Sequence, residues 1–205
     1  MTAVNLTYFD TDGGRAEPLR LLLHIGGIEF TDTRISFADF GKLRGNYPLK
    51  AVPVVEIDGV SYTQTNAMCR YFGKQTGLYP SDPWQGYLCD EIMETVEDAI
   101  HFIVRTFGLK DDALLQARQK LVDDRLVPYL KMLAERLDQA GGVYFTGTDF
   151  SVADLKMFVW IQGLRSGKLE HIPADLVASV APTLADHADR VAAHSGVAGY
   201  YANRG

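Results

Sequence analysis

The sequence predicts an α/β domain followed by an all-helical domain. Within residues 1–76, short β-branched segments alternate with amphipathic ones in the order β-α-β-α-β-β-α, which implies a partly parallel sheet. The segment Gly77–Pro83 contains one glycine and two prolines, so it ends this pattern and marks a linker. The remainder of the chain has helical spacing. We therefore expect domains at 1–77 and 83–205.

Composition indicates a soluble globular protein. With 205 residues, of which 47% are hydrophobic and 22% charged, the chain can bury a sizeable core. No apolar run approaches the ~20 residues of a membrane helix, and no basic segment precedes an apolar one at the N-terminus. We therefore expect neither a membrane span nor a signal peptide. The net charge of −6 argues against nucleic-acid binding.

Cysteine and histidine usage indicates a reduced protein without a metal site. The two cysteines, Cys69 and Cys89, form no CxxC pair. The five histidines are scattered without the HxxxH spacing of a zinc site. We expect buried, reduced thiols in a cytoplasmic protein.

The early elements of the first domain follow from composition and spacing. Leu19, Leu22 and Leu23 share one face of a predicted helix, which Gly26-Gly27 ends. The predicted elements are a strand at 5–9, a turn at 10–14, a helix at 15–25, a strand at 29–35 and a short irregular helix at 37–44.

The stretch from Lys50 to Asn66 is the part around which the first domain is organised. Residues 54–63 form a predicted hairpin, because Asp58-Gly59 suits a type I′ turn. Pro53 opens the hairpin, where its missing N–H does least harm. We expect the Val52–Pro53 bond to be cis, so that the chain turns there and the Val52 backbone can pair with an extended ligand.

A helix start follows the hairpin directly. Gln64-Thr65-Asn66 precedes apolar positions at helical spacing, and free N–H groups at a helix N-terminus attract a carboxylate. The stretch therefore offers either a peptide-pairing edge beside an anion site or an ordinary buried hairpin followed by a capped helix.

The second domain is predicted to be a series of helices. Ser151 and Asp154 have the spacing of a capping box, which assigns Asp154 a structural role at the start of a buried helix. The predicted helices are long runs at 84–107 and 111–137, a helix at 152–164, and two shorter helices that begin at Pro173 and Pro182.

The chain resembles the cytosolic glutathione transferases over its whole length, both in its motifs and in their order. Among these enzymes it is most similar to the sigma class. The matching segments are Leu6-Thr-Tyr-Phe9, Arg15-Ala-Glu17, Val52-Pro53, Gln64-Thr65, Arg70-Tyr71 and the run of Gly147, Ser151, Ala153 and Asp154. The resemblance implies a thioredoxin-like N-terminal domain that binds the co-substrate glutathione. It also implies an all-α C-terminal domain that forms the electrophile pocket, and a homodimer.

By this resemblance, the Tyr8 hydroxyl donates a hydrogen bond to the glutathione sulfur, and Arg15 adds positive potential. A free thiol with a pKa of about 8.5 is only slightly ionised at neutral pH. Lowering that pKa by about 2 units takes roughly 2.7 kcal/mol, and a hydrogen bond to a charged group supplies about 1.5–3 kcal/mol. Taken without the resemblance, an aromatic residue in a strand is more typical of packing.

The resemblance also assigns the remaining glutathione contacts. Val52 pairs with the cysteinyl backbone, while Gln64 and Thr65 hold the γ-glutamyl carboxylate. Arg44 reaches the glycyl carboxylate, unless it is simply a solvated surface charge. The site further includes Phe40, Lys50 and Pro53.

The chain departs from the family pattern in three places. Phe40 stands where a tryptophan is usual, so one indole N–H donor is missing. Ala51 stands where lysine or glutamine is common, with Lys50 one place early. The turn Thr11–Gly14 is one residue longer than usual. These departures bear on glutathione affinity more than on the reaction type.

Glu94, Glu97 and Asp98 share a helix face at i, i+3 and i+4 spacing. The resemblance implies that Asp98 crosses the dimer interface to the amino group of the partner's glutathione. The alternatives are a solvated acidic face or a weak site for a divalent cation, and we assign no metal.

The electrophile pocket is expected to draw on both domains. Its candidate walls are Phe9, His101, Phe102, Arg105 and Trp160. For Trp160, packing in the core is the alternative.

The predicted function is conjugation of the glutathione thiolate to small apolar electrophiles. A glutathione-dependent isomerase, possibly of prostanoid type, would use the same site. A non-catalytic carrier of apolar ligands with the same fold is the alternative from another class. A glutaredoxin-like reductase is disfavoured, since no cysteine occurs before Cys69.

Overall fold

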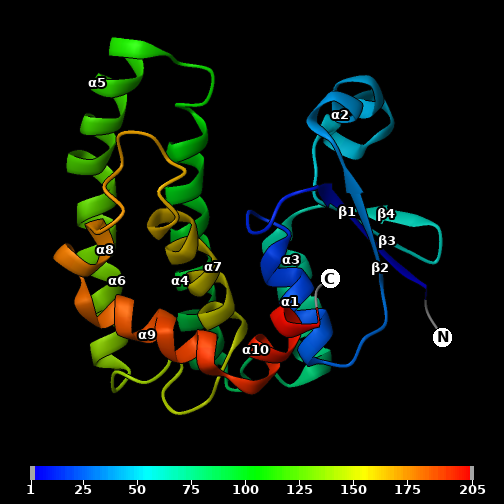
Figure 1. Ribbon diagram of the computed structural model, residues 1–205. Helices are drawn as coiled ribbons and strands as arrows, with labels where there is room; N and C mark the ends of the chain where they lie inside the picture. The colour runs from blue at the N-terminus through cyan, green and yellow to red at the C-terminus, as the bar shows by residue number, and fades with distance from the viewer. Residues whose placement is uncertain (1–2, 204–205) are drawn as a thin grey trace. The chain divides into compact units, whose positions relative to one another are not determined.

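The computed structural model describes residues 3–203 and forms two compact units (Figure 1). The sheet unit comprises the described residues of 1–79 and 195–205, and the helical unit comprises residues 80–194. The boundary falls inside the segment predicted as a linker. The predicted second domain, 83–205, differs from the helical unit at its end, because the last helix belongs to the sheet unit.

The sheet unit is built on a four-stranded mixed sheet in the order β2-β1-β3-β4. Its strands are β1 (Val4–Phe9), β2 (Thr31–Ile35), β3 (Val54–Ile57) and β4 (Val60–Tyr62). β1 is parallel to β2 and antiparallel to β3, so Leu6 lies between Asp32 and Val55. Leu6 and Val55 are fully buried, which places the core of this unit on the two central strands.

Helices complete the sheet unit (Figure 1). They are α1 (Glu17–Ile25), α2 (Phe37–Leu43), α3 (Thr65–Thr76) and α10 (Ser195–Ala202), with 3-10 turns η1 (Arg44–Asn46) and η2 (Pro48–Lys50). α1 packs against both α3 and α10. Leu19, Leu22 and Leu23 are fully buried, which confirms the predicted apolar face of α1.

The hairpin of β3 and β4 confirms the turn prediction. Asp58 has φ 49° and Gly59 has φ 82°, so both central residues take the positive φ of a type I′ turn. The Val52–Pro53 peptide bond is cis, as predicted.

Two boundaries in this unit differ from the prediction. α1 begins at Glu17 rather than residue 15, because Arg15 and Ala16 belong to the turn after β1. β2 begins at Thr31 rather than residue 29, because its pairing with β1 begins opposite Asn5. Composition alone therefore does not set these boundaries. The start of β2 is set by its pairing with β1, and the start of α1 by the turn that precedes it.

The helical unit is arranged around α7, in which every residue from Val152 to Ile161 is buried. α4 and α9 pack on it. Its helices are α4 (Pro83–Val104), α5 (Asp111–Leu121), the π-helical turn η3 (Val122–Leu126), α6 (Val127–Gln139), α7 (Val152–Arg165), α8 (Leu176–Val180) and α9 (Pro182–Ala193). The predicted helix 111–137 is one continuous helical segment in which the π-helical turn η3 lies between α5 and α6. The helix predicted to begin at Pro173 begins at Leu176, after a turn.

Asp154 holds the start of α7, which confirms the predicted capping box. Its carboxylate accepts hydrogen bonds from the Ser151 backbone N–H at 2.8 Å and the Ser151 hydroxyl at 2.7 Å. It also accepts one from the Phe145 backbone N–H at 3.0 Å and lies 2.8 Å from Nε2 of the buried His187. Asp154 is fully buried, so its role is structural. Within residues 3–203, no helix combines the length and the apolar composition of a membrane span.

Candidate functional site

Tyr8 lies at the end of β1 with its hydroxyl facing the turn before α1. The side chain is 8% exposed, and its hydroxyl oxygen accepts a hydrogen bond from the Arg15 backbone N–H at 3.3 Å. The guanidinium carbon of Arg20 lies 5.9 Å from the centre of the Tyr8 ring. A phenol in these surroundings is held in one orientation and polarised from two sides.

Gly14 lets the turn approach the phenol closely. A Cβ at this position would lie 2.9 Å from the Tyr8 hydroxyl oxygen, and Gly14 has φ 68°. Both the contact and the left-handed backbone favour glycine. The turn 10–14, which the sequence marks only as a turn, is therefore shaped around the Tyr8 hydroxyl.

Phe9 and Phe40 belong to one aromatic cluster in the sheet unit. The Phe9 ring stacks on Phe37 with centroids 4.4 Å apart and meets Phe40 edge-on at 5.1 Å. Phe40 also stacks on Tyr47 at 6.1 Å. Phe9 was predicted as a wall of the electrophile pocket, and the structure brings it together with Phe40 of the predicted glutathione site.

Arg44 and Lys50 meet beside this cluster. The Arg44 Nε donates to the Lys50 carbonyl at 3.0 Å, and its guanidinium carbon lies 6.0 Å from the Phe40 ring centre. Leu49 and Lys50 both have positive φ, 55° and 50°. The Arg44 guanidinium is therefore exposed to solvent, and one hydrogen bond to the backbone orients it.

Val52, Gln64 and Thr65 lie around the cis peptide bond and the start of α3. Gln64 has φ 73° and ψ 91°, and no side chain caps the helix that Thr65 begins. Residues in such sparsely populated backbone regions cluster at ligand clamps. The Thr65 side chain is buried and Gln64 is exposed. An uncapped helix start of this kind suits a carboxylate.

Two acidic residues of α4, Glu97 and Asp98, have different surroundings in the structure. Glu97 pairs with the buried Lys156 at 2.7 Å, and its backbone carbonyl lies 3.0 Å from Nδ1 of His101. Asp98 is exposed and makes no ion pair within the described residues. No group of three or more His, Cys, Asp or Glu side chains in residues 3–203 could hold a metal ion.

The predicted pocket residues of the helical unit have different surroundings. His101 and Arg105 are exposed, while Phe102 is half-buried and meets Tyr129 edge-on at 5.9 Å. Trp160 is 4% exposed and lies in the core of this unit. Its indole nitrogen is buried and has no hydrogen-bond partner among the described residues.

Sequence reasoning missed the buried charges near Tyr8. Arg20 is fully buried, lies 3.1 Å from Glu17 and donates from Nε to Asp32 at 3.0 Å. Burial on α10 raises the pKa of both Tyr200 and Tyr201. The i, i+3 spacing of Glu17 and Arg20 was the one available signal.

The protein's own thiols are not candidates for the reacting nucleophile. Cys69 and Cys89 are both free and fully buried. Burial raises the pKa of the Cys89 thiol to about 12. A thiol that remains protonated at neutral pH is a poor nucleophile.

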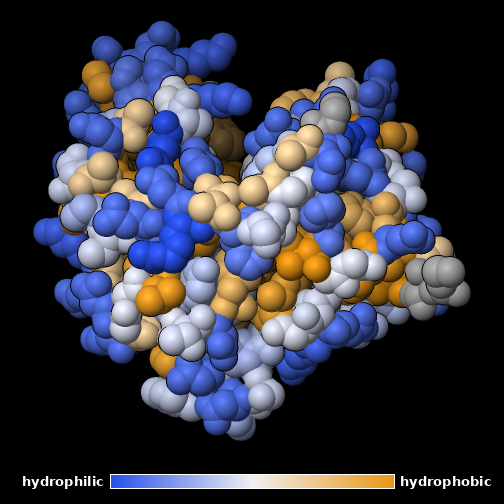
Figure 2. Space-filling model, turned by 60° about the horizontal axis from the view of Figure 1, so that its bottom comes forward, coloured by the Kyte–Doolittle hydropathy of each residue, from blue (hydrophilic) through white to orange (hydrophobic). Residues whose placement is uncertain are grey.

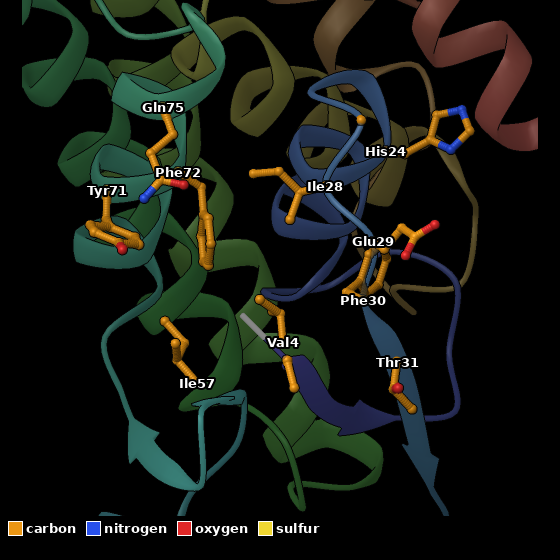
Figure 3. A pocket seen from close by; sticks show the side chains of 12 residues that line it. Val4, His24, Ile28, Glu29, Phe30, Thr31, Ile57, Tyr71, Phe72 and Gln75 are labelled. Carbon is orange, nitrogen blue, oxygen red and sulfur yellow. The ribbon is translucent and has the colours of Figure 1, made fainter. Parts of the chain in front are cut away.

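A separate hollow of about 1230 Å³ lies in the sheet unit at the other end of β1 (Figure 3). Val4 lines it, whereas Tyr8 is four positions further along the same strand. Ile28 and Phe72 point toward each other across it. Figure 2 shows that apolar residues reach the surface among polar ones on the face drawn there. None of the predicted site residues lines this hollow, so its size does not identify the active site.

Two family descriptions match most of the chain. "Glutathione S-transferase, N-terminal domain" matches residues 4–74, and "Glutathione S-transferase, C-terminal domain" matches residues 97–204. Among curated proteins, hematopoietic prostaglandin D synthase of Gallus gallus is 32% identical over 206 residues, covering 100% of this chain and 98% of the relative. Glutathione S-transferase 3 of Caenorhabditis elegans is 29% identical over 160 residues, covering 76% and 77%.

The solved structures agree with the fold. The structure of prostaglandin synthase D of Nilaparvata lugens matches with a TM-score of 0.87 at 24% identity, covering 99% of this chain and 98% of that one. The mixed sheet and the helical unit confirm the predicted thioredoxin-like domain followed by an all-α domain. The chain therefore belongs to the glutathione S-transferase family, and it is a glutathione transferase that takes glutathione as its co-substrate.

Proposed function

We propose that this glutathione transferase conjugates glutathione to small apolar electrophiles through a thiolate that the Tyr8 hydroxyl stabilises. One observation carries the proposal: the Tyr8 oxygen accepts a backbone hydrogen bond from Arg15 at 3.3 Å. A hydroxyl that accepts in this way keeps its own proton for donation and is made a stronger donor by polarisation. Arg15 adds positive potential that favours a thiolate.

The proposed placement of glutathione uses the sheet unit. The Val52 backbone pairs with the cysteinyl residue beside Pro53, in the manner of a neighbouring strand. Gln64, Thr65 and the uncapped start of α3 hold the γ-glutamyl carboxylate. The glycyl carboxylate falls to Arg44 and Lys50, which contact each other at 3.0 Å.

We assign the enzyme to the sigma class, and the similarity to prostaglandin D synthase of Gallus gallus supports this assignment. The same similarity favours a second candidate, a glutathione-dependent isomerase that uses the same thiolate. The carrier function has no comparable support, because Tyr8 and its turn are built around the hydroxyl. Two buried free cysteines fit a reducing compartment such as the cytoplasm.

A panel of chlorinated aromatics, isothiocyanates, enals, peroxides and endoperoxides would separate these functions, with glutathione omitted as the control. Conjugation predicts consumption of glutathione in proportion to product. Isomerisation predicts product without net consumption of glutathione. A carrier would bind apolar compounds and accelerate none of these reactions over the glutathione-only background.

We further propose a homodimer in which Asp98 reaches the glutathione of the other subunit. Asp98 is exposed, and its charge is not consumed by an ion pair within residues 3–203. The amino group of glutathione is a cation at neutral pH and needs an anion, which Gln64 and Thr65 cannot supply. Asp98→Asn keeps the shape and removes the charge. It should weaken glutathione binding about tenfold without unfolding the protein.

Mixed dimers test whether Asp98 acts across the interface. Combining Asp98→Asn chains with Tyr8→Phe chains places both defects at one site and leaves the other site intact if Asp98 acts in trans. That intact site should show wild-type glutathione affinity and near-wild-type turnover. A mixed dimer in which no site has both properties would place Asp98 in its own chain's site or in none.

A further inference from the structure

Two arginines converge on one aromatic ring in the helical unit. The guanidinium carbon of Arg125 lies 4.8 Å from the centre of the Phe102 ring, and that of Arg105 lies 5.8 Å from it. Arg105 follows Phe102 by three positions at the end of α4, whereas Arg125 comes from η3. Tyr129, from the start of α6, closes the ring's edge at 5.9 Å. We call these four residues the arginine–aromatic cluster.

The π-helical turn sets the direction of Arg125. η3 inserts wider turns between α5 and α6, which run on without a break in the chain. Because one inserted residue rotates later side chains by about 100° around the helix axis, the turn changes which residues face α4. π-helical turns of this kind occur frequently at functional sites. Arg125 is thus brought to Phe102 by an irregularity of the backbone.

Neither arginine is neutralised within residues 3–203. Arg105 and Arg125 make no ion pair there, although most arginines that the structure describes in the helical unit have a carboxylate or carbonyl partner. Asp98 lies one helical turn before Phe102 and pairs with neither of them. In a chain of net charge −6, two uncompensated cations at one ring form a local site of positive potential.

The geometry points to an anion subsite in the arginine–aromatic cluster, which we propose selects electrophiles that carry a carboxylate. This inference rests on the proposed conjugation of apolar electrophiles and names the class among them. A guanidinium that lies against an aromatic face can still donate hydrogen bonds to a carboxylate, because its N–H groups point outward in the plane of the guanidinium. Phe102 and Tyr129 provide the apolar surface for the aromatic or alkyl body of the same ligand. The favoured substrates are therefore amphipathic acids.

A matched pair of substrates tests the charge alone. A chlorodinitrobenzoate and its methyl ester share the reacting carbon and differ in the carboxylate. The wild-type enzyme should show a higher kcat/KM for the acid, relative to the uncatalysed rate of each compound, and this preference should fall as salt is added. In Arg125→Gln, and separately in Arg105→Gln, the acid-to-ester ratio of kcat/KM should fall about fivefold.

Lys131→Gln is the matched control. Lys131 is an exposed residue of α6 that also carries one positive charge, and the cations against the Phe102 ring are those of Arg105 and Arg125. Removing it changes the net charge of the helical unit equally but leaves the cluster intact. The acid-to-ester ratio should stay at the wild-type value. An equal fall in Lys131→Gln and Arg125→Gln would overturn the subsite in favour of general charge attraction.

Binding of an unreactive acid separates the two proposals. Dinitrobenzoate lacks the leaving group, so its affinity for the full-length enzyme can be measured by calorimetry whether or not the enzyme turns over the ester. The subsite predicts weaker binding in both arginine variants than in wild type and Lys131→Gln. Equal binding in all four proteins would overturn it. Failure of the wild-type enzyme to conjugate the ester would instead count against the proposed function.

Discussion

Replacing Tyr8 with Phe removes one oxygen atom from a nearly buried ring. The side chain is 8% exposed, so the change keeps its packing, and it deletes the proposed donor to the glutathione sulfur. Loss of a hydrogen bond to a charged acceptor costs about 1.5–3 kcal/mol. Because one pKa unit corresponds to about 1.36 kcal/mol, the pKa of the bound thiol should rise by about 1–2 units.

The direct measurement is titration of the bound thiol through the ultraviolet absorbance of its thiolate. Well below the pKa of the wild-type complex, conjugation should fall about 10- to 100-fold, because only the thiolate reacts. The sign of the pH dependence follows from the raised pKa. The deficit should be largest below the pKa of the wild-type complex, and it should shrink as the pH rises past the pKa of the variant.

Tyr62→Phe provides the control for loss of a tyrosine hydroxyl in the same unit. Tyr62 is 48% exposed on the edge strand β4, which β3 separates from β1. Its replacement should change neither the thiol titration nor turnover. The reasoning is refuted if the Tyr8→Phe complex, saturated with glutathione, titrates like the wild type while the chemical step limits its rate.

Three further substitutions test the environment that the structure describes. Gly14→Ala adds a Cβ 2.9 Å from the Tyr8 hydroxyl oxygen, so kcat/KM should fall about tenfold while glutathione affinity, measured by calorimetry, changes little. Lys156→Met removes the buried ion-pair partner of Glu97 and should lower the free energy of unfolding by about 3 kcal/mol in urea titrations. Adding Glu97→Gln should recover part of that loss, and no recovery would show that the ion pair is not the cause. Asp154→Asn weakens a fully buried cap and should lower stability by about 2–4 kcal/mol, with a matching fall in Tm that a merely local role would not produce.

Local patterns predicted the parts of the fold that depend on neighbouring residues. Asp58-Gly59 predicted the hairpin because the turn geometry needs positive φ at those two positions. Ser151 and Asp154 predicted the start of α7 because a capping box is closed within four residues. Neither pattern depends on what lies across the domain.

Those local patterns did not predict contacts between segments that are distant in the sequence. Lys156 is buried against Glu97, 59 positions away, because α4 and α7 bring those faces together. The sequence alone put Glu94, Glu97 and Asp98 on one helix face, with a solvated face as one alternative, and in the structure Glu94 and Asp98 are exposed while Glu97 is half-buried. Arg20 of α1 similarly reaches Asp32, which the pairing of β2 with β1 places opposite Leu6.

The sequence by itself determined the order of the elements and the two-part architecture. These rest on period and turn chemistry, which act over a few residues. The glutathione-site residues were assigned by the resemblance to the family and stay a prediction. Only the tertiary structure decided that α10 packs on α1, that Gly14 closes on the Tyr8 hydroxyl, and that η3 brings Arg125 to Phe102. The first and the last depend on packing between segments far apart in the chain, and the Gly14 contact depends on the fold of the turn after β1. The burial of a polar group depends on the residues that pack against it in the fold and not on its neighbours in sequence.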